Sequence, residues 1–129
     1  MDKPTFSKAE LEQKDIHELL KLLSDIKRLQ KARTLKYKDI RIIFQSEEGY
    51  MYEIKGTKQT YFLRIDRKNR ALIHNCEDWI RRGMRENKLC KHFDRIFQEI
   101  YEKEAKAILI DLLLNSWVFL DSDNYLKTR

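Results

Sequence analysis

The chain has 129 residues and a net charge of +6, with 42% hydrophobic and 37% charged residues and little Gly or Pro. This length and composition favour one domain with a modest core and argue against long flexible linkers. The polar N-terminus and the lack of a sufficiently long apolar stretch argue against a secretory signal or membrane span, so we expect a soluble, cytoplasmic or otherwise intracellular protein.

The first predicted element is a helix. Ser7 and Glu10 have the spacing of a capping box, in which each side chain receives a backbone N–H of the other residue. Apolar residues between Ile16 and Leu29 then recur at helical spacing. We therefore expect one helix over about 8–31.

Four β-rich segments follow the predicted helix. They are rich in β-branched and aromatic residues, and polar or Gly-containing turns separate them. Their approximate bounds are 36–44, 50–54, 61–65 and 71–74. The pattern indicates an antiparallel meander of three to four strands.

Helical periodicity returns over residues 90–120. This part is predicted to form one long helix or a helix pair with a bend near 102–106, and a polar tail begins at Asp121. The predicted fold class is α+β. Its N-terminal segment, 1–33, packs on or extends a domain formed by residues 34–129.

Both cysteines and two of the three histidines lie within nineteen residues of one another. His74-x-Cys76 and Cys90-x-His92 form two close pairs separated by thirteen residues, and such paired ligands around a loop are typical of tetrahedral Zn²⁺ sites. Alternate residues of a strand share a face, while the start of a helix favours a thiolate. The four residues are therefore predicted zinc ligands; the alternatives are a surface histidine and ordinary core cysteines or a disulfide.

The same stretch resembles the SWIM zinc-finger family. The resemblance is carried by Asp78-Trp79, Arg82-Gly83 and Cys90-Lys91-His92, and it covers about residues 40–105. His74 stands where the family usually has a cysteine, and imidazole can replace thiolate on zinc. The resemblance implies a strand hairpin, a zinc-binding loop and a helix. It also implies a non-catalytic module that binds DNA or protein, alone or within larger chromatin and recombination proteins.

Two residues of the loop between the ligand pairs have alternative interpretations. Trp79 is predicted to pack over the loop, and its alternative role is an exposed platform for stacking a base. Gly83 is predicted to supply a positive φ that turns the loop back. The third histidine, His17, is predicted to be a surface or interface residue of the first helix.

Basic residues gather in two parts of the sequence, 27–41 and 54–91. A positive face can attract polyanions, although the same charges can also be no more than a solvated surface. If they bind nucleic acid, with DNA as the expected form, we expect phosphate contacts from the loop and from the neighbouring strand turn. The candidate residues are Arg64, Lys68, Arg70, Arg81, Arg82, Arg85, Lys88 and Lys91.

Two other classes of function remain as alternatives. The apolar stretch 112–119 is either core or a docking surface for a partner protein or a second copy, which would make the protein an assembly module, such as an accessory subunit in DNA repair or recombination. An enzyme is disfavoured because four protein ligands fill a tetrahedral zinc site. The sequence also lacks a Gly-rich phosphate loop and a nucleophile elbow.

Overall fold

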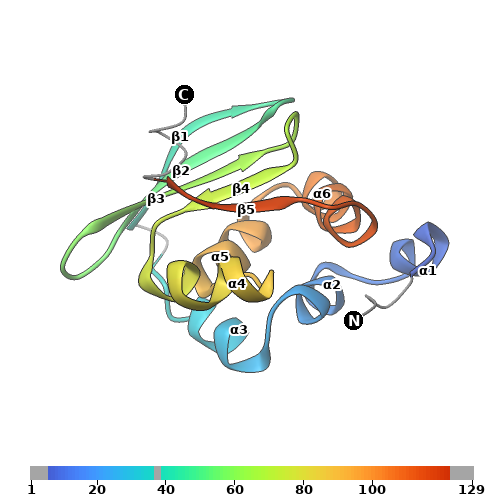
Figure 1. The fold of residues 1–129 in the computed structure, drawn as a ribbon, viewed down its shortest axis with the longest axis horizontal. Helices are drawn as coiled ribbons and strands as arrows, with labels where there is room; N and C mark the ends of the chain where they lie inside the picture. Colours follow the sequence, from blue (N-terminus) through green and yellow to red (C-terminus); the bar gives the residue numbers. More distant parts are fainter. Residues whose placement is uncertain (1–5, 37–38, 123–129) are drawn as a thin grey trace.

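A five-stranded sheet with helices on one face forms the protein (Figure 1). The computed structural model describes residues 6–36 and 39–122, so Tyr37, Lys38 and most of the predicted polar tail lie outside the described residues. The helices are α1 (Lys8–Glu12), α2 (Ile16–Leu23), α3 (Ile26–Ala32), the π-helical turn η2 (Trp79–Gly83), α4 (Met84–Glu86), α5 (Lys91–Glu99) and α6 (Glu102–Leu114). The strands are β1 (Ile40–Ser46), β2 (Gly49–Lys55), β3 (Thr60–Asp66), β4 (Ala71–His74) and β5 (Val118–Asp121). The α+β class is confirmed.

The predicted N-terminal helix is in fact three short helices. The capping box of Ser7 and Glu10 is present and begins α1. A second capping box begins α2, where the Asp15 carboxylate accepts the backbone N–H of Glu18 at 2.8 Å. Asp25 caps α3 without a capping box: its carboxylate accepts the backbone N–H of Arg28 at 2.9 Å. Asp15 and Asp25 have extended backbone, so the chain leaves the helical conformation at these residues and turns between α1, α2 and α3.

The sheet contains one strand more than the predicted three to four. Strands β1 to β4 form the predicted antiparallel meander, and the order continues as β1-β2-β3-β4-β5. Strand β5 pairs with β4 in parallel, from Ala71 with Val118 to His74 with Asp121. Because parallel neighbours require a crossover, the whole helical segment between β4 and β5 returns the chain to the sheet edge beside β4.

Residues 90–120 contain a helix pair and the fifth strand. Helix α5 ends at Glu99, the next residue, Ile100, has extended backbone, and α6 starts at Glu102, so the bend lies just before the predicted position. Helix α6 ends before Asn115, and β5 replaces the predicted helical end. Of the apolar stretch 112–119, Leu112 and Trp117 are buried, whereas Leu114 and Val118 are exposed.

One core joins the helical layer to the sheet. Leu11, Leu19 and Leu63 are among its fully buried members, together with Phe93 and Ile108 from the C-terminal helices. The N-terminal helices therefore pack on the rest of the chain and contribute to the same core. Among the described helices, none is both long and apolar enough to cross a membrane.

Asp111 fixes the start of β5 to the turn between β3 and β4. Its carboxylate accepts the Arg70 guanidinium at 2.7 and 3.2 Å and the Trp117 indole N–H at 2.7 Å. The bond from Arg70 is the largest of the effects that lower the pKa of Asp111. Arg70 itself ends the turn between β3 and β4 with a positive φ of 48°.

Replacing Asp111 by asparagine is expected to lower stability in a pH-dependent way. The folded state lowers the pKa of Asp111 below 3.8, so its contribution is present above that value and is lost as the pH falls through the lowered pKa. Thermal melts of both proteins should therefore differ by several degrees at pH 7, and the difference should shrink as the pH falls below 3.8 and through the lowered pKa of Asp111. A pH-independent difference would show that the charge of Asp111 is not responsible.

Candidate metal centre

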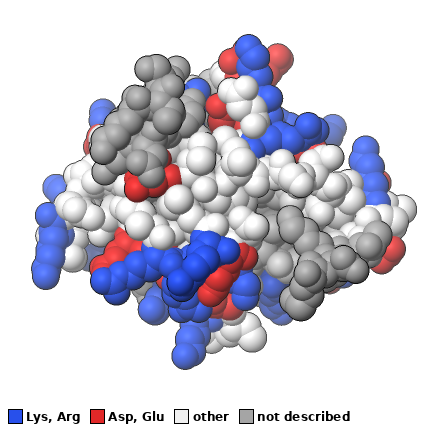
Figure 2. Space-filling model, in the orientation of Figure 1, with Lys and Arg blue, Asp and Glu red and all other residues white. Residues whose placement is uncertain are grey.

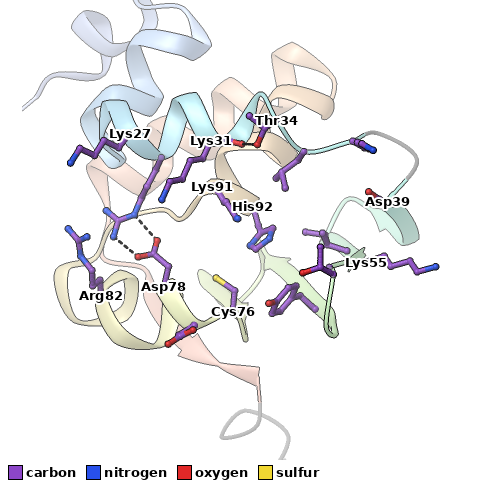
Figure 3. Close-up of a pocket in the computed structure, with 18 of the residues that line it drawn as sticks. Lys27, Lys31, Thr34, Asp39, Lys55, Cys76, Asp78, Arg82, Lys91 and His92 are labelled. Carbon is purple, nitrogen blue, oxygen red and sulfur yellow. Dashed lines mark hydrogen bonds and ion pairs between the residues drawn. The ribbon is translucent and has the colours of Figure 1, made fainter.

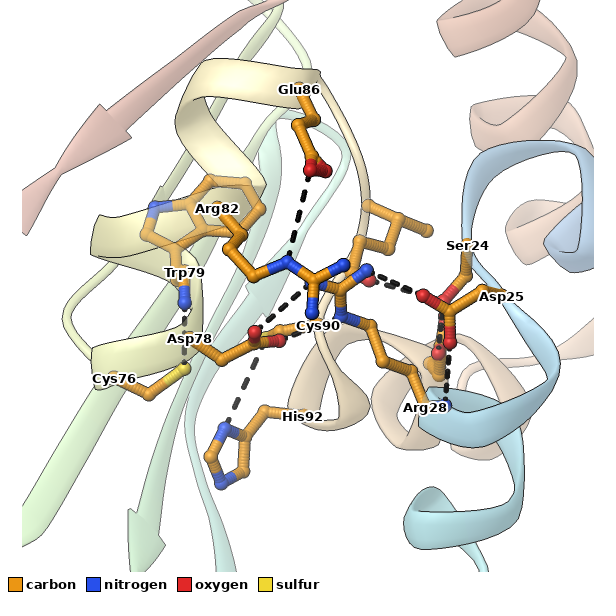
Figure 4. A network of polar contacts seen from close by, with 12 residues as sticks. Ser24, Asp25, Arg28, Cys76, Asp78, Trp79, Arg82, Glu86, Cys90 and His92 are labelled. Carbon is orange, nitrogen blue, oxygen red and sulfur yellow. Dashed lines mark hydrogen bonds and ion pairs between the residues drawn. The ribbon is translucent and has the colours of Figure 1, made fainter.

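The four predicted ligands meet at one buried point. His74 ends β4, Cys76 follows two residues later, Cys90 caps α5, and His92 lies in the first turn of that helix. One ligand atom from each of the four side chains can be chosen so that all lie within 4.8 Å of one another, and all four residues are buried. Figure 4 shows Cys76, Cys90 and His92 converging between the sheet and α5. The residues therefore form a group that can hold a metal ion.

The separations fit a tetrahedral ion after a small contraction. Zinc–ligand distances of 2.0–2.3 Å place two nitrogens about 3.3 Å apart, a nitrogen and a sulfur about 3.6 Å apart, and two sulfurs about 3.8 Å apart. His74 Nε2 lies 3.1 Å from His92 Nδ1, and Cys90 Sγ lies 4.0 Å from the same nitrogen. The ligand atoms lie up to 4.8 Å apart, so the widest of these distances must shorten by about 1 Å to reach the tetrahedral values. Small rotations of the side chains can supply this change.

His74 is oriented for binding by its other ring nitrogen. The backbone oxygen of Phe62, on the neighbouring strand β3, lies 2.5 Å from His74 Nδ1. A carbonyl oxygen can only accept a hydrogen bond, so His74 Nδ1 carries the proton and donates it. In the neutral ring Nε2 then has a free lone pair, which is directed toward the other three side chains. This arrangement, in which a ligating imidazole donates its second N–H to a carbonyl, is typical of protein metal sites.

The electrostatics of the cluster favour a cation. The hydrogen bond from Cys90 is the main effect that lowers the pKa of Cys76, while burial raises the pKa of Cys90 well above its ordinary value. A cation bound between the two sulfurs would favour the thiolate form of both. Burial also lowers the pKa of His92, which favours the neutral imidazole that metal ions require.

Trp79 secures the loop that joins the ligand pairs. Its side chain is fully buried, packs against Phe93 and Phe119, and donates its indole N–H to the Leu120 oxygen at 2.9 Å. Its backbone N–H donates to Cys76 Sγ at 3.4 Å. The packing interpretation is confirmed. The alternative of an exposed stacking platform is wrong because the ring has no accessible face.

The predicted role of Gly83 is wrong. Its φ is −55°, which any residue adopts, and the positive φ that turns the loop belongs to Asn87, at 55°. A Cβ at Gly83 would lie 2.8 Å from Trp79 Cε3 and 2.9 Å from the Lys88 oxygen. Glycine is therefore needed for close packing of the loop on the Trp79 ring.

Replacing Gly83 by alanine is expected to destabilise the protein by about 1–3 kcal/mol, the usual cost of overpacking. The added methyl group must displace both the indole ring and a backbone oxygen. Urea unfolding of the metal-loaded protein measures the effect. Asn87→Gly is the matched control: glycine tolerates positive φ, so this change should be nearly neutral. Equal stability of Gly83→Ala and wild type would contradict the close packing.

An ion-pair network ties the loop to the N-terminal helices, and the sequence analysis missed it. Arg28 on α3 is buried and donates to both oxygens of Asp78, at 2.7 and 3.0 Å, and to Asp25 at 2.7 Å (Figure 4). The sequence does indicate Asp25 as a cap of α3, close to Arg28. It does not indicate that Arg28 pairs with Asp78, which lies fifty positions further along the chain. The network positions the backbone directly after Cys76.

A second buried contact links α5 to the same helices. The Ser24 hydroxyl lies 3.1 Å from the Leu89 oxygen and 2.6 Å from a carboxyl oxygen of Asp94. The hydroxyl is the donor to both oxygens, and its contact with the Asp94 carboxyl is the shorter of the two. Burial raises the pKa of Asp94 to about 8, and the hydrogen bond from Ser24 opposes this shift.

The eight predicted nucleic-acid residues do not form one patch. Arg70 binds Asp111 at the end of β4 remote from the ligands. In the loop, Arg81 pairs with Glu77 at 2.9 Å and Arg82 with Glu86 at 3.7 Å. Figure 2 shows basic and acidic side chains interleaved on the face that it presents.

The other candidate residues differ in their surroundings. Arg64 lies over the Phe44 ring, 5.6 Å from its centroid, while Lys68 is exposed in the β3–β4 turn. Arg85 and Lys88 are exposed on the loop and form no ion pair within the described part of the chain. Of the four basic side chains of the loop, Arg81 and Arg82 are therefore held in weak, exposed ion pairs. Arg85 and Lys88 are in no ion pair with a described residue.

A cleft of about 760 Å³ opens beside the ligands, with Cys76 and His92 in its lining (Figure 3). Its walls include Lys91, which was predicted, and several lysines that the site prediction omitted. The omitted lysines are Lys27, Lys31, Lys36 and Lys55. The basic bias of 27–41 was visible in the sequence, but its position beside the ligands depends on how α3 packs.

The chain was compared with models of known protein families, with curated proteins and with solved structures, and none of the three comparisons gave a match. The function is therefore argued from the site itself.

Proposed function

We propose that this protein is a zinc-stabilised module of SWIM type that binds nucleic acid, with DNA as the expected form. The observation that carries the proposal is the convergence of two sulfurs and two imidazole nitrogens on one buried point. Zinc is the metal that best suits a tetrahedral S₂N₂ ligand set. Two thiolates and two neutral imidazoles also cancel its charge, which permits burial.

A structural role for the ion follows from the number of ligands. A catalytic zinc keeps a position open for water, whereas four protein ligands complete a tetrahedron. The ion would join the end of β4 to the start of α5 and hold the intervening loop in a fixed shape. The order of strand hairpin, loop and helix, together with the Cys90-Lys91-His92 spacing, supports the SWIM-type proposal.

Nucleic-acid binding is proposed for the basic loop held by the ion. Arg85 and Lys88 are exposed there, and Arg81 can leave its exposed pair with Glu77 at little cost. Phosphate contacts from a rigid turn give affinity with little base specificity. Binding should therefore weaken steeply with added salt.

Charge reversal of the loop tests this function. The variant Arg81→Glu/Arg85→Glu/Lys88→Glu should bind a labelled DNA at least about tenfold more weakly and show a smaller salt slope, whatever the DNA sequence. The control Lys14→Glu/Lys21→Glu/Lys103→Glu makes the same change in net charge on other elements and should change affinity about twofold or less. Equal affinity of the loop variant and the control would refute the loop assignment.

Assembly with a partner protein is the second candidate, and the edge strand β1 favours it. Strand β1 ends the sheet, and Ile42, Ile43 and Phe44 are 36–48% exposed. Exposed edge strands pair readily with another chain, either a second copy or a different protein such as a repair or recombination subunit. Light scattering distinguishes the candidates: a strict monomer that binds DNA favours the first, and a dimer disrupted by Ile43→Lys favours the second.

A further inference from the structure

We propose that the cleft beside the metal ligands holds a single-stranded nucleic acid by its phosphates. The proposal rests on the nucleic-acid-binding function above and adds the form of the nucleic acid and its place on the protein. Its basis is a concave site beside the proposed ion, with lysines from three separate parts of the chain in its lining.

The walls of the cleft come from segments far apart in sequence. Helix α3 contributes Lys27 and Lys31, strand β2 contributes Lys55, and α5 contributes Lys91. In Figure 3, Lys27 and Lys55 lie on opposite sides, with His92 between them. Lys27 and Lys31 are one helical turn apart and therefore share a face of α3. The proposed metal ligand His92 therefore lies between the lysines of α3 on one side of the cleft and Lys55 on the other.

The acidic residues of the cleft are largely neutralised by partners. Asp25 and Asp78 both bind Arg28, and Glu77 binds Arg81. Asp39 is the other acidic residue in the lining. The lining therefore presents fewer free negative charges than its composition suggests.

The lysines of the cleft have no such partners. Lys27, Lys31, Lys55 and Lys91 form no ion pair with any described residue. Their ammonium groups remain available to an external anion, and several of them around one cavity produce a positive potential that a single small anion would not neutralise. A chain of phosphates matches this distribution.

The shape of the cleft selects a single strand. Proteins that read a duplex insert a helix or ribbon into a groove about 12 Å wide, whereas this site is a hollow of about 760 Å³. A positive groove that follows the backbone, with an aromatic side chain at hand, is typical of single-strand binding. Tyr61 supplies a half-buried ring in the lining, 5.1 Å from the His92 ring.

The proposal is tested with the zinc-loaded full chain and labelled oligonucleotides of about twelve residues. Fluorescence anisotropy compares oligo-dT, oligo-U and a DNA duplex of equal length at several salt concentrations. We expect the single strands to bind at least about tenfold more tightly than the duplex. The oligo-dT and oligo-U arms show whether the occupant is DNA or RNA.

The diagnostic variant is Lys27→Glu/Lys31→Glu. It should weaken single-strand binding at least about tenfold and reduce the salt slope by about 1.4, the value for two phosphate contacts. Zinc content and Tm should match wild type because both side chains are exposed. The control Lys14→Glu/Lys103→Glu carries the same charge change away from the cleft and should retain affinity within about twofold.

The possible results separate this proposal from the broader function. Equal binding by the cleft variant and its control, or equal affinity for duplex and single strand, would overturn the cleft assignment. If the loop variant loses binding while the cleft variant keeps it, the nucleic-acid function stands and only the cleft proposal fails. If zinc-loaded wild type binds none of the three probes, both proposals fail.

Discussion

Cys90→Ser is expected to lose bound metal and cooperative folding together. Cys90 is fully buried at the start of α5, where its sulfur lies 4.0 Å from His92 Nδ1. Structural zinc contributes about 10–16 kcal/mol of apparent binding free energy in small zinc-finger peptides. A whole domain is stable by only about 5–15 kcal/mol, so loss of this ligand should remove most or all of the stability. Circular dichroism melts and zinc analysis of the purified variant measure both effects.

The histidines supply a matched control for the cysteine variant. His92→Ala removes a ligand, whereas His17→Ala removes an exposed histidine of α2. We expect the first to lose zinc and to melt without a cooperative transition, and the second to retain about one zinc and a wild-type Tm. Full metal content and an unchanged Tm in either Cys90→Ser or His92→Ala would show that the ligand assignment is wrong.

Arg28→Ala is expected to give the second largest effect. The guanidinium is buried and donates three hydrogen bonds to Asp25 and Asp78, and the bond to Asp78 is the main effect that raises its pKa. Breaking a fully buried ion pair costs about 3–5 kcal/mol. Both carboxylates are about one third exposed, so solvent screening reduces the expected loss to about 2–3 kcal/mol.

Arg28→Ala should also weaken the retention of zinc. Asp78 lies two residues after Cys76, so release of its partner should loosen the loop and speed zinc transfer to a chelator. Arg81→Ala is the control because Arg81 makes only an exposed pair with Glu77, worth under about 1 kcal/mol. Urea melts and chelator kinetics that rank the two variants equally would contradict the proposed link between α3 and the loop.

The cluster of two histidines and two cysteines could be predicted because its geometry is local. Residues 74 and 76 are neighbours at the end of one strand, and residues 90 and 92 are neighbours at the start of one helix. The two residues of each pair are close in space in any fold that keeps this strand and this helix. Only the contact between the two pairs had to be inferred. The antiparallel meander was predictable for the same reason, since turn residues separate consecutive strands.

The helix boundaries failed where a local signal was outweighed by periodicity. Asp15 with Glu18 has the spacing of a capping box, but the apolar repeat runs through it and suggested one long helix. Similarly, Val118 and Phe119 continued an apolar helical stretch, and their pairing with β4 depends on a crossover of more than forty residues. Sequence periodicity does not encode such a long-range pairing.

The charged residues show the same limit. Arg81, Arg82 and Arg70 looked equivalent as basic residues near the zinc loop, yet each has a carboxylate partner in the fold. Lys27 and Lys31 lie nearly fifty residues before the ligand Cys76, and packing of α3 brings them to the same cleft. Net charge along a chain predicts attraction to polyanions, but the fold decides which charges remain available.

The most direct test of the account is the metal content and coordination of the purified protein. We predict about one zinc per chain, with X-ray absorption showing two sulfur ligands at about 2.3 Å and two nitrogen ligands at about 2.0 Å. Protein that folds to the same stability with no bound metal, and that takes up none when zinc is supplied, would contradict the central claim.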